Sequence, residues 1–449
     1  MEGIDMENIR KLAEMAVEEA LSCGAETAEV KLEEDLNFSV NVRNRKVETL
    51  TESVSNRIHI LVSSDQRRAS SSSSDLSPES IKALAGDAVN LCRIMEQDEY
   101  YRLPDPDQLG TAERDLKLYH PGITEMPTDR KIRIARDLED MALNMDKRIL
   151  IDQSSYSSSV SKISIANSAG FCDSYRQSYN SVLLSCAAED ETDGKNRGKK
   201  QSAYWYSAGT SFEDLKPLEE IASEAVRRTV RKIGSIKPKT CRVPVVFDSI
   251  TARGFLNSIS NAVSGKNIYR RSSFLAGMLD RKIAPPTLTV IDDPLMPGRI
   301  GSRPFDSEGV ISRQNTVIGE GVLKTYLMNT YQANKLGMKT TGSDGGVSNF
   351  FIRPGTMSEE DIISSVDDGL YLTSTSGQGA NWSTGDFSQG AEGIWIENGT
   401  LSYPVSGFTI AGTFSEMMED IEMIGKDIEW DTSVVSPPFK IRKMVISGS

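Results

Sequence analysis

The sequence contains only two histidines in 449 residues, His59 and His120. His59 lies in an alternating apolar run typical of a strand, and His120 lies in a loop-like Leu-Tyr-His-Pro-Gly segment. Neither belongs to an H-E-x-x-H helix, which places two imidazoles on one face toward zinc. A Ser-His-Asp triad would need one of these histidines as its base, and no G-x-S-x-G elbow is present. The shortage of histidine therefore argues against both a histidine-ligated zinc and a serine triad within this chain.

Cysteine is also scarce and shows no paired spacing. None of the five cysteines forms a C-x-x-C pair with another; they are Cys23, Cys92, Cys172, Cys186 and Cys241. An odd number of widely spaced cysteines is typical of reduced thiols that are buried as small apolar side chains. A zinc or disulfide framework is the less favoured interpretation.

Long apolar runs and excess positive charge are absent as well. No apolar run approaches the ~20 residues of a membrane-spanning helix, and residues 1–21 form an acidic amphipathic pattern rather than a signal peptide. The formal net charge of −13 argues against nucleic acid as the main partner, because that binding needs clustered Lys and Arg. We therefore expect a cytoplasmic protein with neither a membrane nor a nucleic-acid partner.

The order of the sequence patterns predicts an α+β fold. An Asp-Leu-x-Pro motif precedes an apolar helical stripe at Asp75 and again at Asp214, 139 residues later, each time after several strand-like runs. This recurrence predicts a duplicated strand-then-helix unit, and the clustering of strands favours α+β over a doubly wound sheet. The expected parts are an N-terminal α+β unit at 1–103, a proline-rich linker at 104–127, a middle α+β unit at 128–240 and a β-rich C-terminal domain at 241–449.

Apolar periodicity predicts individual elements within these parts. The expected helices include 9–22, 128–145 and 326–336, and the expected strands include 28–32, 38–42 and 57–62.

A glycine-rich polar run at 377–390 leads into apolar segments on either side of Asn398-Gly399. Asn-Gly between two β-rich runs is a strong hairpin signal, because both central positions of a type I′ turn need φ > 0. The sequence therefore predicts a flexible polar loop, which includes 385–390, followed by a rigid β-ribbon. Loops positioned by a scaffold in this way often carry binding residues.

Four acidic residues offer a carboxylate site for magnesium or calcium as an alternative: Asp292, Asp293, Asp306 and Glu308. Both of the segments that hold them also fit plain turns, because Asp and Gly are common turn residues. We prefer the turn interpretation.

Four segments, taken together, resemble the TldD/PmbA family. They are residues 23–30, 301–309, 320–327 with Tyr331, and 385–390 continuing through 408–412, and their order and spacing cover essentially the whole chain. The family was once described as modulators of DNA gyrase and is understood as a two-subunit cytosolic metalloprotease. In this family a TldD-like subunit carries an H-E-x-x-x-H helix and a cysteine ligand for zinc, and a PmbA-like (TldE-like) subunit lacks that motif.

The chain resembles the PmbA-like subunit. Neutral or apolar residues stand where the resemblance would place the histidines and glutamate, and 385–390 holds no cysteine; these degenerate positions are Asn257, Ser258, Asn261 and Ala262. Amides and hydroxyls are poor zinc ligands, and none activates water as a glutamate does. The resemblance thus implies no catalytic residue, metal or cofactor in this chain. It implies zinc only in a TldD-like partner subunit, with a homodimer in the absence of that partner.

The resemblance further implies that the substrates are unfolded or extended peptides, which lie against a sheet edge by backbone hydrogen bonding. The candidate contacts of this chain with a peptide are Asn381, Asp386, Ser388 and Gln389. Two other interpretations stay open. One is a self-sufficient hydrolase with a carboxylate-bound metal or a serine centre, and the other is a non-catalytic, homo-oligomeric peptide-binding protein.

Overall fold

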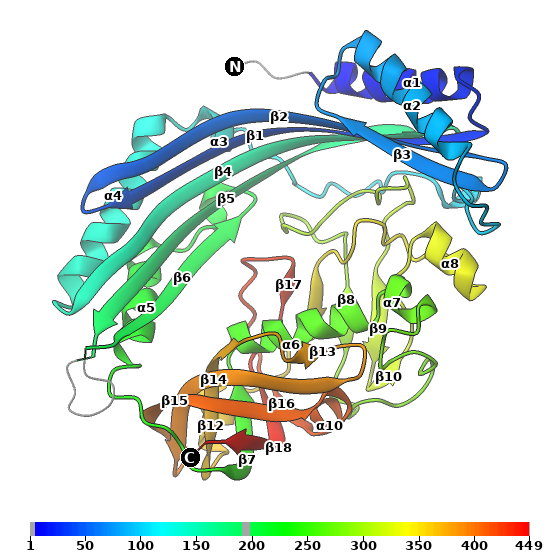
Figure 1. The fold of residues 1–449 in the computed structure, drawn as a ribbon. Coiled ribbons are helices and arrows are strands. Elements are labelled where there is room, and N and C mark those ends of the chain that lie inside the picture. Colours follow the sequence, from blue (N-terminus) through cyan, green and yellow to red (C-terminus); the bar gives the residue numbers. More distant parts are fainter. Residues whose placement is uncertain (1–4, 191–197, 449) are drawn as a thin grey trace.

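The computed structural model, which describes residues 5–190 and 198–448, consists of a curved sheet that arches over a β-rich C-terminal domain (Figure 1). The predicted α+β class is confirmed. All five thiols are unpaired, as expected. Among the helices of these described residues, none has the length and apolar character needed to cross a membrane.

The first half of the chain passes twice through the order helix, three strands, helix. The first pass is α1 (Met6–Ser22), β1 (Thr27–Arg43), β2 (Lys46–Ser64), β3 (Arg67–Ser73) and α2 (Pro78–Cys92). The second pass is α4 (Thr128–Met145), β4 (Ile149–Asn167), β5 (Cys172–Glu189), β6 (Lys200–Gly209) and α5 (Leu218–Val230). The predicted repetition of a strands-then-helix unit is therefore confirmed. Between the two passes lie only the short helices η1 (Pro106–Gln108) and α3 (Gly122–Glu125), and η2 (Phe212–Asp214) precedes α5.

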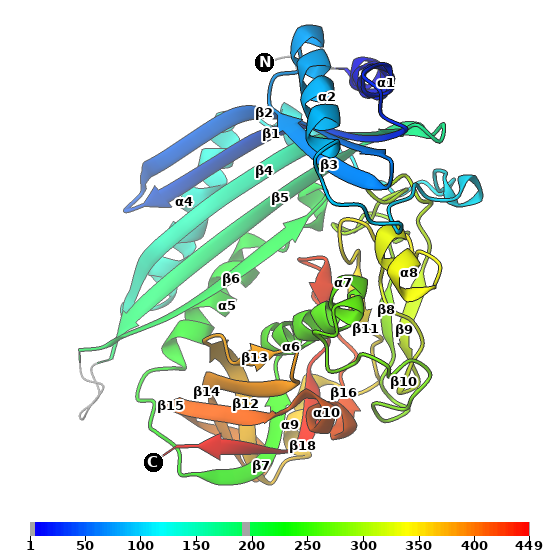
Figure 2. The same ribbon diagram turned by 45° about the vertical axis from the view of Figure 1, so that its right-hand side comes forward.

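Both passes contribute to one six-stranded antiparallel sheet with the order β3-β2-β1-β4-β5-β6. Alternate residues of β1 are buried, as a strand with one covered face requires. Helices α1 and α2 cover one end of this face, where Val30 and Leu32 are buried, and α4 and α5 cover the other end, where Val40 and Val42 are buried (Figure 1). The opposite face looks toward the C-terminal domain (Figure 2). The two repeated units thus form a single arch.

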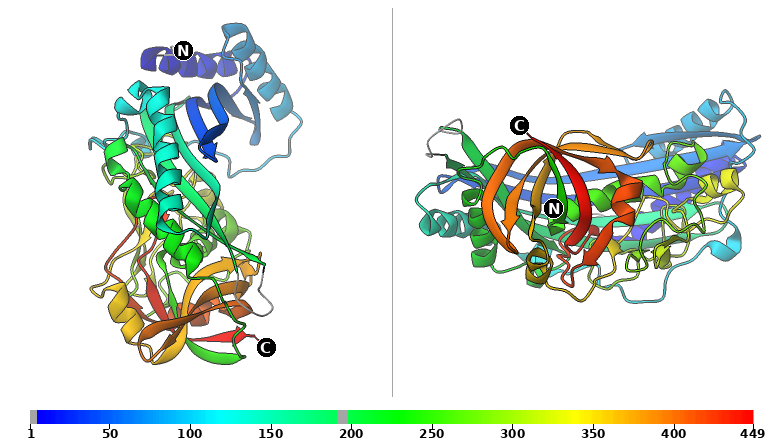
Figure 3. Two further views of the ribbon diagram at one scale, coloured as in Figure 1. Left: turned by 90° about the vertical axis from the view of Figure 1, so that its left-hand side faces the viewer. Right: turned by 90° about the horizontal axis from the view of Figure 1, so that it is seen from below.

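The C-terminal domain is built from two sheets and short helices. Its helices are α6 (Ser249–Ala262), α7 (Gly265–Tyr269), α8 (Thr330–Leu336), α9 (Glu359–Ser364) and α10 (Phe414–Glu419). A seven-stranded sheet has the order β12-β7-β18-β15-β14-β13, with β16 on β18, and an additional β12–β14 pairing makes it barrel-like (Figure 3). Its strands are β7 (Cys241–Phe247), β12 (Asp368–Ser376), β13 (Ala380–Asn381), β14 (Asp386–Glu397), β15 (Thr400–Thr413), β16 (Ile421–Ile424) and β18 (Phe439–Ser447). The second, five-stranded sheet comprises β10 (Val322–Leu323), β9 (Asn315–Gly319), β8 (Val290–Asp292), β11 (Phe350–Ile352) and β17 (Val434–Val435).

The hairpin predicted at Asn398-Gly399 joins β14 to β15, and both residues have positive φ, 50° and 72°. The polar segment before it differs from the prediction. Residues 386–390 belong to β14 and pair with β15, so the expectation of a flexible loop there was wrong. Buried Phe387 alternates with exposed Asp386 and Ser388, and this period of two defines a strand with one covered face.

The arch contacts the C-terminal domain at both of its ends. At the α1–α2 end, Asp98 accepts a hydrogen bond from the Tyr331 hydroxyl (2.8 Å) and forms an ion pair with Lys335 (2.8 Å). Both partners are on α8. At the other end, Ser207 Oγ (2.9 Å) and Ala208 N (2.8 Å) of β6 donate to Asp431. Polar contacts at both ends therefore fix the concave face of the arch above α6 (Figures 1 and 2).

Candidate functional site

Helix α6 begins directly after the buried strand β7 and lies on the side of the C-terminal domain that faces the arch (Figure 1). Of the four degenerate positions, Asn257 and Asn261 are exposed, whereas Ser258 is 7% exposed and Ala262 is fully buried. The backbone carbonyl oxygens of the exposed pair accept side-chain amides: Asn261 Nδ2 donates to Asn257 O (2.9 Å), and Asn267 Nδ2 donates to Asn261 O (2.8 Å). The exposed face of α6 therefore presents neutral amides, and the other two positions are packed inward.

The donor chemistry of this helix does not fit a zinc ion. Zinc takes thiolate, imidazole or carboxylate ligands, and the four positions supply two amides, one hydroxyl and a methyl group. Across residues 5–190 and 198–448, no three His, Cys, Asp or Glu side chains are grouped in a way that would hold a metal ion. His59 lies in strand β2, as predicted, opposite Lys31.

The candidate peptide contacts gather where β13 meets β14. Asn381 is paired directly with Asp386, and exposed Ser388 follows two residues later, so these three side chains share one side of the ribbon. Gln389 lies on the other side, where its Nε2 donates to Gly377 O (3.3 Å). The Asp386 carboxylate accepts from Thr384 Oγ1 (2.6 Å). The structure thus brings three of the four predicted residues together.

An aromatic cluster holds α6 against this ribbon. The ring of Phe414 lies 5.5 Å from Phe255 of α6, 5.6 Å from Phe274 and 5.7 Å from Phe387 of β14, measured between centroids. Backbone bonds reinforce it, because Phe274 N donates to Trp382 O (3.1 Å) and Phe414 N donates to Gly385 O (2.7 Å). The aromatic cluster therefore packs the buried face of α6 against the Phe387 side of the β13–β14 ribbon.

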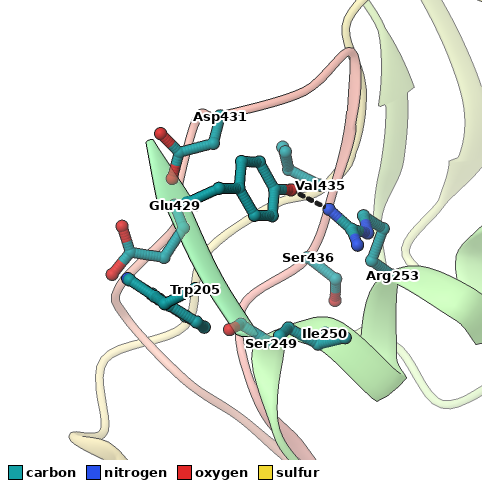
Figure 4. Close-up of a pocket in the computed structure, with 9 residues that line it drawn as sticks. Trp205, Ser249, Ile250, Arg253, Glu429, Asp431, Val435 and Ser436 are labelled. Carbon is teal, nitrogen blue, oxygen red and sulfur yellow. Dashed lines mark hydrogen bonds between the residues drawn. The ribbon is translucent and has the colours of Figure 1, made fainter. Parts of the chain in front are cut away.

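Two further residues, one on the ribbon and one on α6, are not evident from the sequence. Trp382, at the turn between β13 and β14, is 37% exposed although it is the largest side chain of the segment. Arg253, one helical turn before Asn257, donates to the Tyr206 hydroxyl of β6. It lines a small pocket with Asp431 and Ser436 (Figure 4). This pocket, about 20 Å³, has room for about one water molecule. Arg253 thus joins α6 to the arch.

Backbone or hydroxyl groups donate hydrogen bonds to each of the four acidic residues proposed as an alternative metal site. Ser348 N and Oγ donate to Asp292 (2.6 and 2.8 Å), and Leu295 N donates to Asp293 (2.9 Å). Glu308 N and Val310 N donate to Asp306 (2.9 and 3.0 Å). Thr330 N and Oγ1 donate to Glu308 (2.9 and 2.7 Å). Asp293 and Asp306 accept from residues of their own turns, whereas Asp292 and Glu308 accept from Ser348 and Thr330, which are distant in the sequence. The turn interpretation therefore describes two of the four residues.

A mostly buried carboxylate of the arch, Glu29 on β1, leads to a prediction about pH. Burial raises the pKa of Glu29 to about 7, with Asp344 and Asp306 adding to the rise and Arg68, 3.0 Å away, opposing it. A carboxyl group whose pKa is higher in the folded state than in the unfolded state stabilises the fold fully at low pH, and this stabilisation is lost as pH rises through about 7. We expect the free energy of unfolding to be greater at pH 5 than at pH 7.5, by on the order of 2 kcal/mol.

Urea unfolding at the two pH values measures this difference, and the Glu29→Gln variant is the control. Glutamine keeps an acceptor for Arg68 and does not titrate, so its pH dependence is expected to be smaller. An unchanged pH dependence in that variant would assign the effect to other groups.

Three consecutive family domains match this chain. They are the PmbA/TldA metallopeptidase domain 1 at residues 28–92, the central domain at 121–233 and the C-terminal domain at 240–448. Metalloprotease PmbA of Escherichia coli O157:H7 is 33% identical over 98% of this chain and 97% of its own length. The metalloprotease PmbA homolog of Haemophilus influenzae is 31% identical over 99% of this chain and 97% of its own length. The chain therefore belongs to the PmbA/TldD family, which confirms the resemblance.

Solved structures share the whole architecture. A protein of Bacteroides thetaiotaomicron, described as a proposed modulator of DNA gyrase, has a TM-score of 0.93 at 29% identity, with 100% of both chains covered. TldE from Thermococcus kodakarensis has a TM-score of 0.86 at 21% identity, covering 97% of this chain and 100% of that one, which is a likeness of fold. The arch and the barrel-like domain are thus common to these proteins.

Proposed function

We propose that this chain is the PmbA/TldE-type subunit of a cytosolic, two-subunit metalloprotease for extended peptides, and that a TldD-like partner supplies the zinc. One observation carries the proposal. The chain matches proteins named metalloprotease PmbA over nearly its full length, yet the exposed face of α6 presents Asn257 and Asn261, which are poor zinc ligands. The function of this subunit is then to bind the partner and the peptide.

The β13–β14 ribbon is the proposed peptide contact. Strand β13 ends the seven-stranded sheet, and an edge strand binds an extended peptide through backbone hydrogen bonds that do not depend on sequence. Asn381, Asp386 and Ser388 add polar contacts, and exposed Trp382 adds an apolar surface. Because the aromatic cluster holds this ribbon rigidly beside α6, little ordering is needed when a peptide binds.

Metal and activity measurements on the chain alone and with a TldD-like protein test the proposal. We expect no stoichiometric zinc and no peptide cleavage for the chain alone, and both in the pair. Zinc and cleavage in the isolated chain would establish the self-sufficient hydrolase instead. Peptide binding by a homo-oligomer that never pairs with a TldD-like protein would favour the non-catalytic alternative.

The same assay tests the ribbon through two double variants of the pair. Asp386→Asn with Ser388→Ala is expected to lower peptide cleavage about tenfold, which corresponds to about 1.4 kcal/mol. The matched control is Glu397→Gln with Ser402→Ala, because Ser402 of β15 is hydrogen bonded (2.6 Å) to Glu397 at the opposite end of β14. Equal cleavage by both double variants would show that the peptide does not contact this side of the ribbon.

A further inference from the structure

The helix-covered face of the arch contains a cavity of about 190 Å³ midway along β1. It lies where β2, β1 and β4 run side by side, and Ile123 and Thr124 of α3 and Lys131 of α4 also line it. An apolar cavity of about 150 Å³ holds a benzene-sized molecule, so this one holds a molecule as large as a small amino acid.

The walls of the cavity follow from the strand register. Leu36 of β1 is paired with Val54 of β2 and with Val160 of β4, and these three residues form an apolar floor. Phe38, the next residue on this face, is paired with Glu52 of β2. The cavity is therefore apolar on one side and has a carboxylate on an exposed strand at its rim.

Lys131 of α4 supplies a positive charge on the opposite side. Its side chain is 7% exposed, and its Nζ lies 4.3 Å from the centroid of the Phe38 ring. Among the described residues, no carboxylate lies within ion-pair distance of this ammonium group. Burial lowers the pKa of Lys131, and Glu52 opposes that change from a distance. A buried ammonium group that borders a cavity and lies over an aromatic ring, with no carboxylate of the described residues beside it, is open to an anionic ligand.

A second lysine on the same face shows the usual arrangement. Lys162 of β4 is also mostly buried, and its Nζ lies 2.6 Å from the carboxylate of Glu34, its direct neighbour on β1. A buried charge is normally paired in this way, because desolvation is costly. Lys131 differs from Lys162, because it borders a cavity and is not paired with a carboxylate among the described residues.

We propose that this cavity binds a small zwitterion, an α-amino acid with an apolar side chain. Its carboxylate contacts Lys131, its ammonium group faces Glu52, and its side chain rests on Leu36, Val54 and Val160. The two charges of the site have opposite sign and stand more than an ion-pair distance apart, which matches the separated charges of an amino acid better than it matches a simple anion. The site lies on the face of the sheet opposite the C-terminal domain, so it is independent of the proposed peptide contact.

Isothermal titration of the full chain with L-leucine tests the proposal. We expect one molecule to bind per chain. Leucinamide, which lacks the carboxylate, and N-acetyl-leucine, which lacks the ammonium group, are expected to bind at least about tenfold more weakly. Absence of leucine binding, or equal binding of N-acetyl-leucine, would overturn the zwitterion assignment.

Variants of the two charged residues locate the bound molecule. Lys131→Met and Glu52→Gln are each expected to weaken leucine binding at least about tenfold, whereas Lys147→Met, at an exposed lysine just beyond the same helix, is expected to leave it unchanged. Since Lys131→Met removes an unpaired buried charge, its unfolding midpoint is expected to be no lower than that of the wild type. Unchanged leucine affinity in Lys131→Met would overturn the assignment.

Discussion

We expect Asp248→Ala to lower the free energy of unfolding by about 4 kcal/mol. Asp248 is 1% exposed and has two functions. One carboxylate oxygen caps α6, where it accepts from Thr251 N (2.8 Å) and Thr251 Oγ1 (2.9 Å), and the other accepts from Arg228 Nη1 (2.9 Å). Alanine removes the cap and, of the two ion-pair partners of Arg228 among the described residues, leaves Glu224.

The matched control is Asp5→Ala, because Asp5 caps α1 with the same geometry, accepting from Asn8 N (2.8 Å), but is exposed and has no buried cation beside it. Its loss is expected to cost about 1 kcal/mol. Chemical denaturation of both variants measures the difference, which represents the buried ion pair. If both variants lose the same free energy of unfolding, the ion pair with Arg228 adds no stability beyond that of the helix cap.

Local patterns in the sequence predicted those elements whose own residues determine them. The helix Thr128–Met145 matches the expected range, because its apolar residues recur at helical spacing and form one buried stripe. The Asn398-Gly399 turn also followed from two residues alone. The expected helix at 326–336 begins only at Thr330, because Asn329 and Gln332 form a capping box there and Tyr326 is buried instead.

Elements that depend on distant partners were less predictable. Two strands expected at 28–32 and 38–42 are one continuous strand, β1. Glu34, which lies between the two expected strands, is buried and paired with Lys162, which is 128 residues away in the sequence. Residues 386–390 likewise form a strand because β15 pairs with them. The residues of a strand do not indicate which distant strand will pair with it.

The candidate site was likewise predictable where local motifs determine it and not where distant residues do. The sequence identified the amides of α6 and the polar residues of the ribbon, since both stand at recognisable motif positions. It gave no indication that Phe414 would join these two segments, or that Arg253 would reach Tyr206 on the arch. Lys131 lies in an ordinary amphipathic helix, and only the register of three strands reveals the cavity beside it.

We expect Gly379→Ala to reduce peptide cleavage by the assembled pair about 100-fold, under the proposed function. A Cβ at this position would lie 1.4 Å from the carbonyl oxygen of Ser388, so β13 has to move away from β14. That movement breaks the bond from Ser388 N to Gly379 O (2.8 Å) and displaces Asn381 and Trp382, which follow it in the chain. A displacement of about 1 Å at a site that positions a reactant is sufficient for a loss of this size.

The control for this last variant is Gly86→Ala in helix α2, where a Cβ has no neighbour within 4 Å. It is expected to keep full cleavage and to stabilise the helix by up to about 1 kcal/mol. The kcat/KM for an extended peptide is measured for both variants together with their unfolding midpoints. If Gly379→Ala keeps its midpoint and loses cleavage, the position of β13 matters for the peptide and not for the fold. Full cleavage in that variant would show that the peptide does not use this edge, because the contact between Gly379 and Ser388 leaves no room for a side chain without moving the strand.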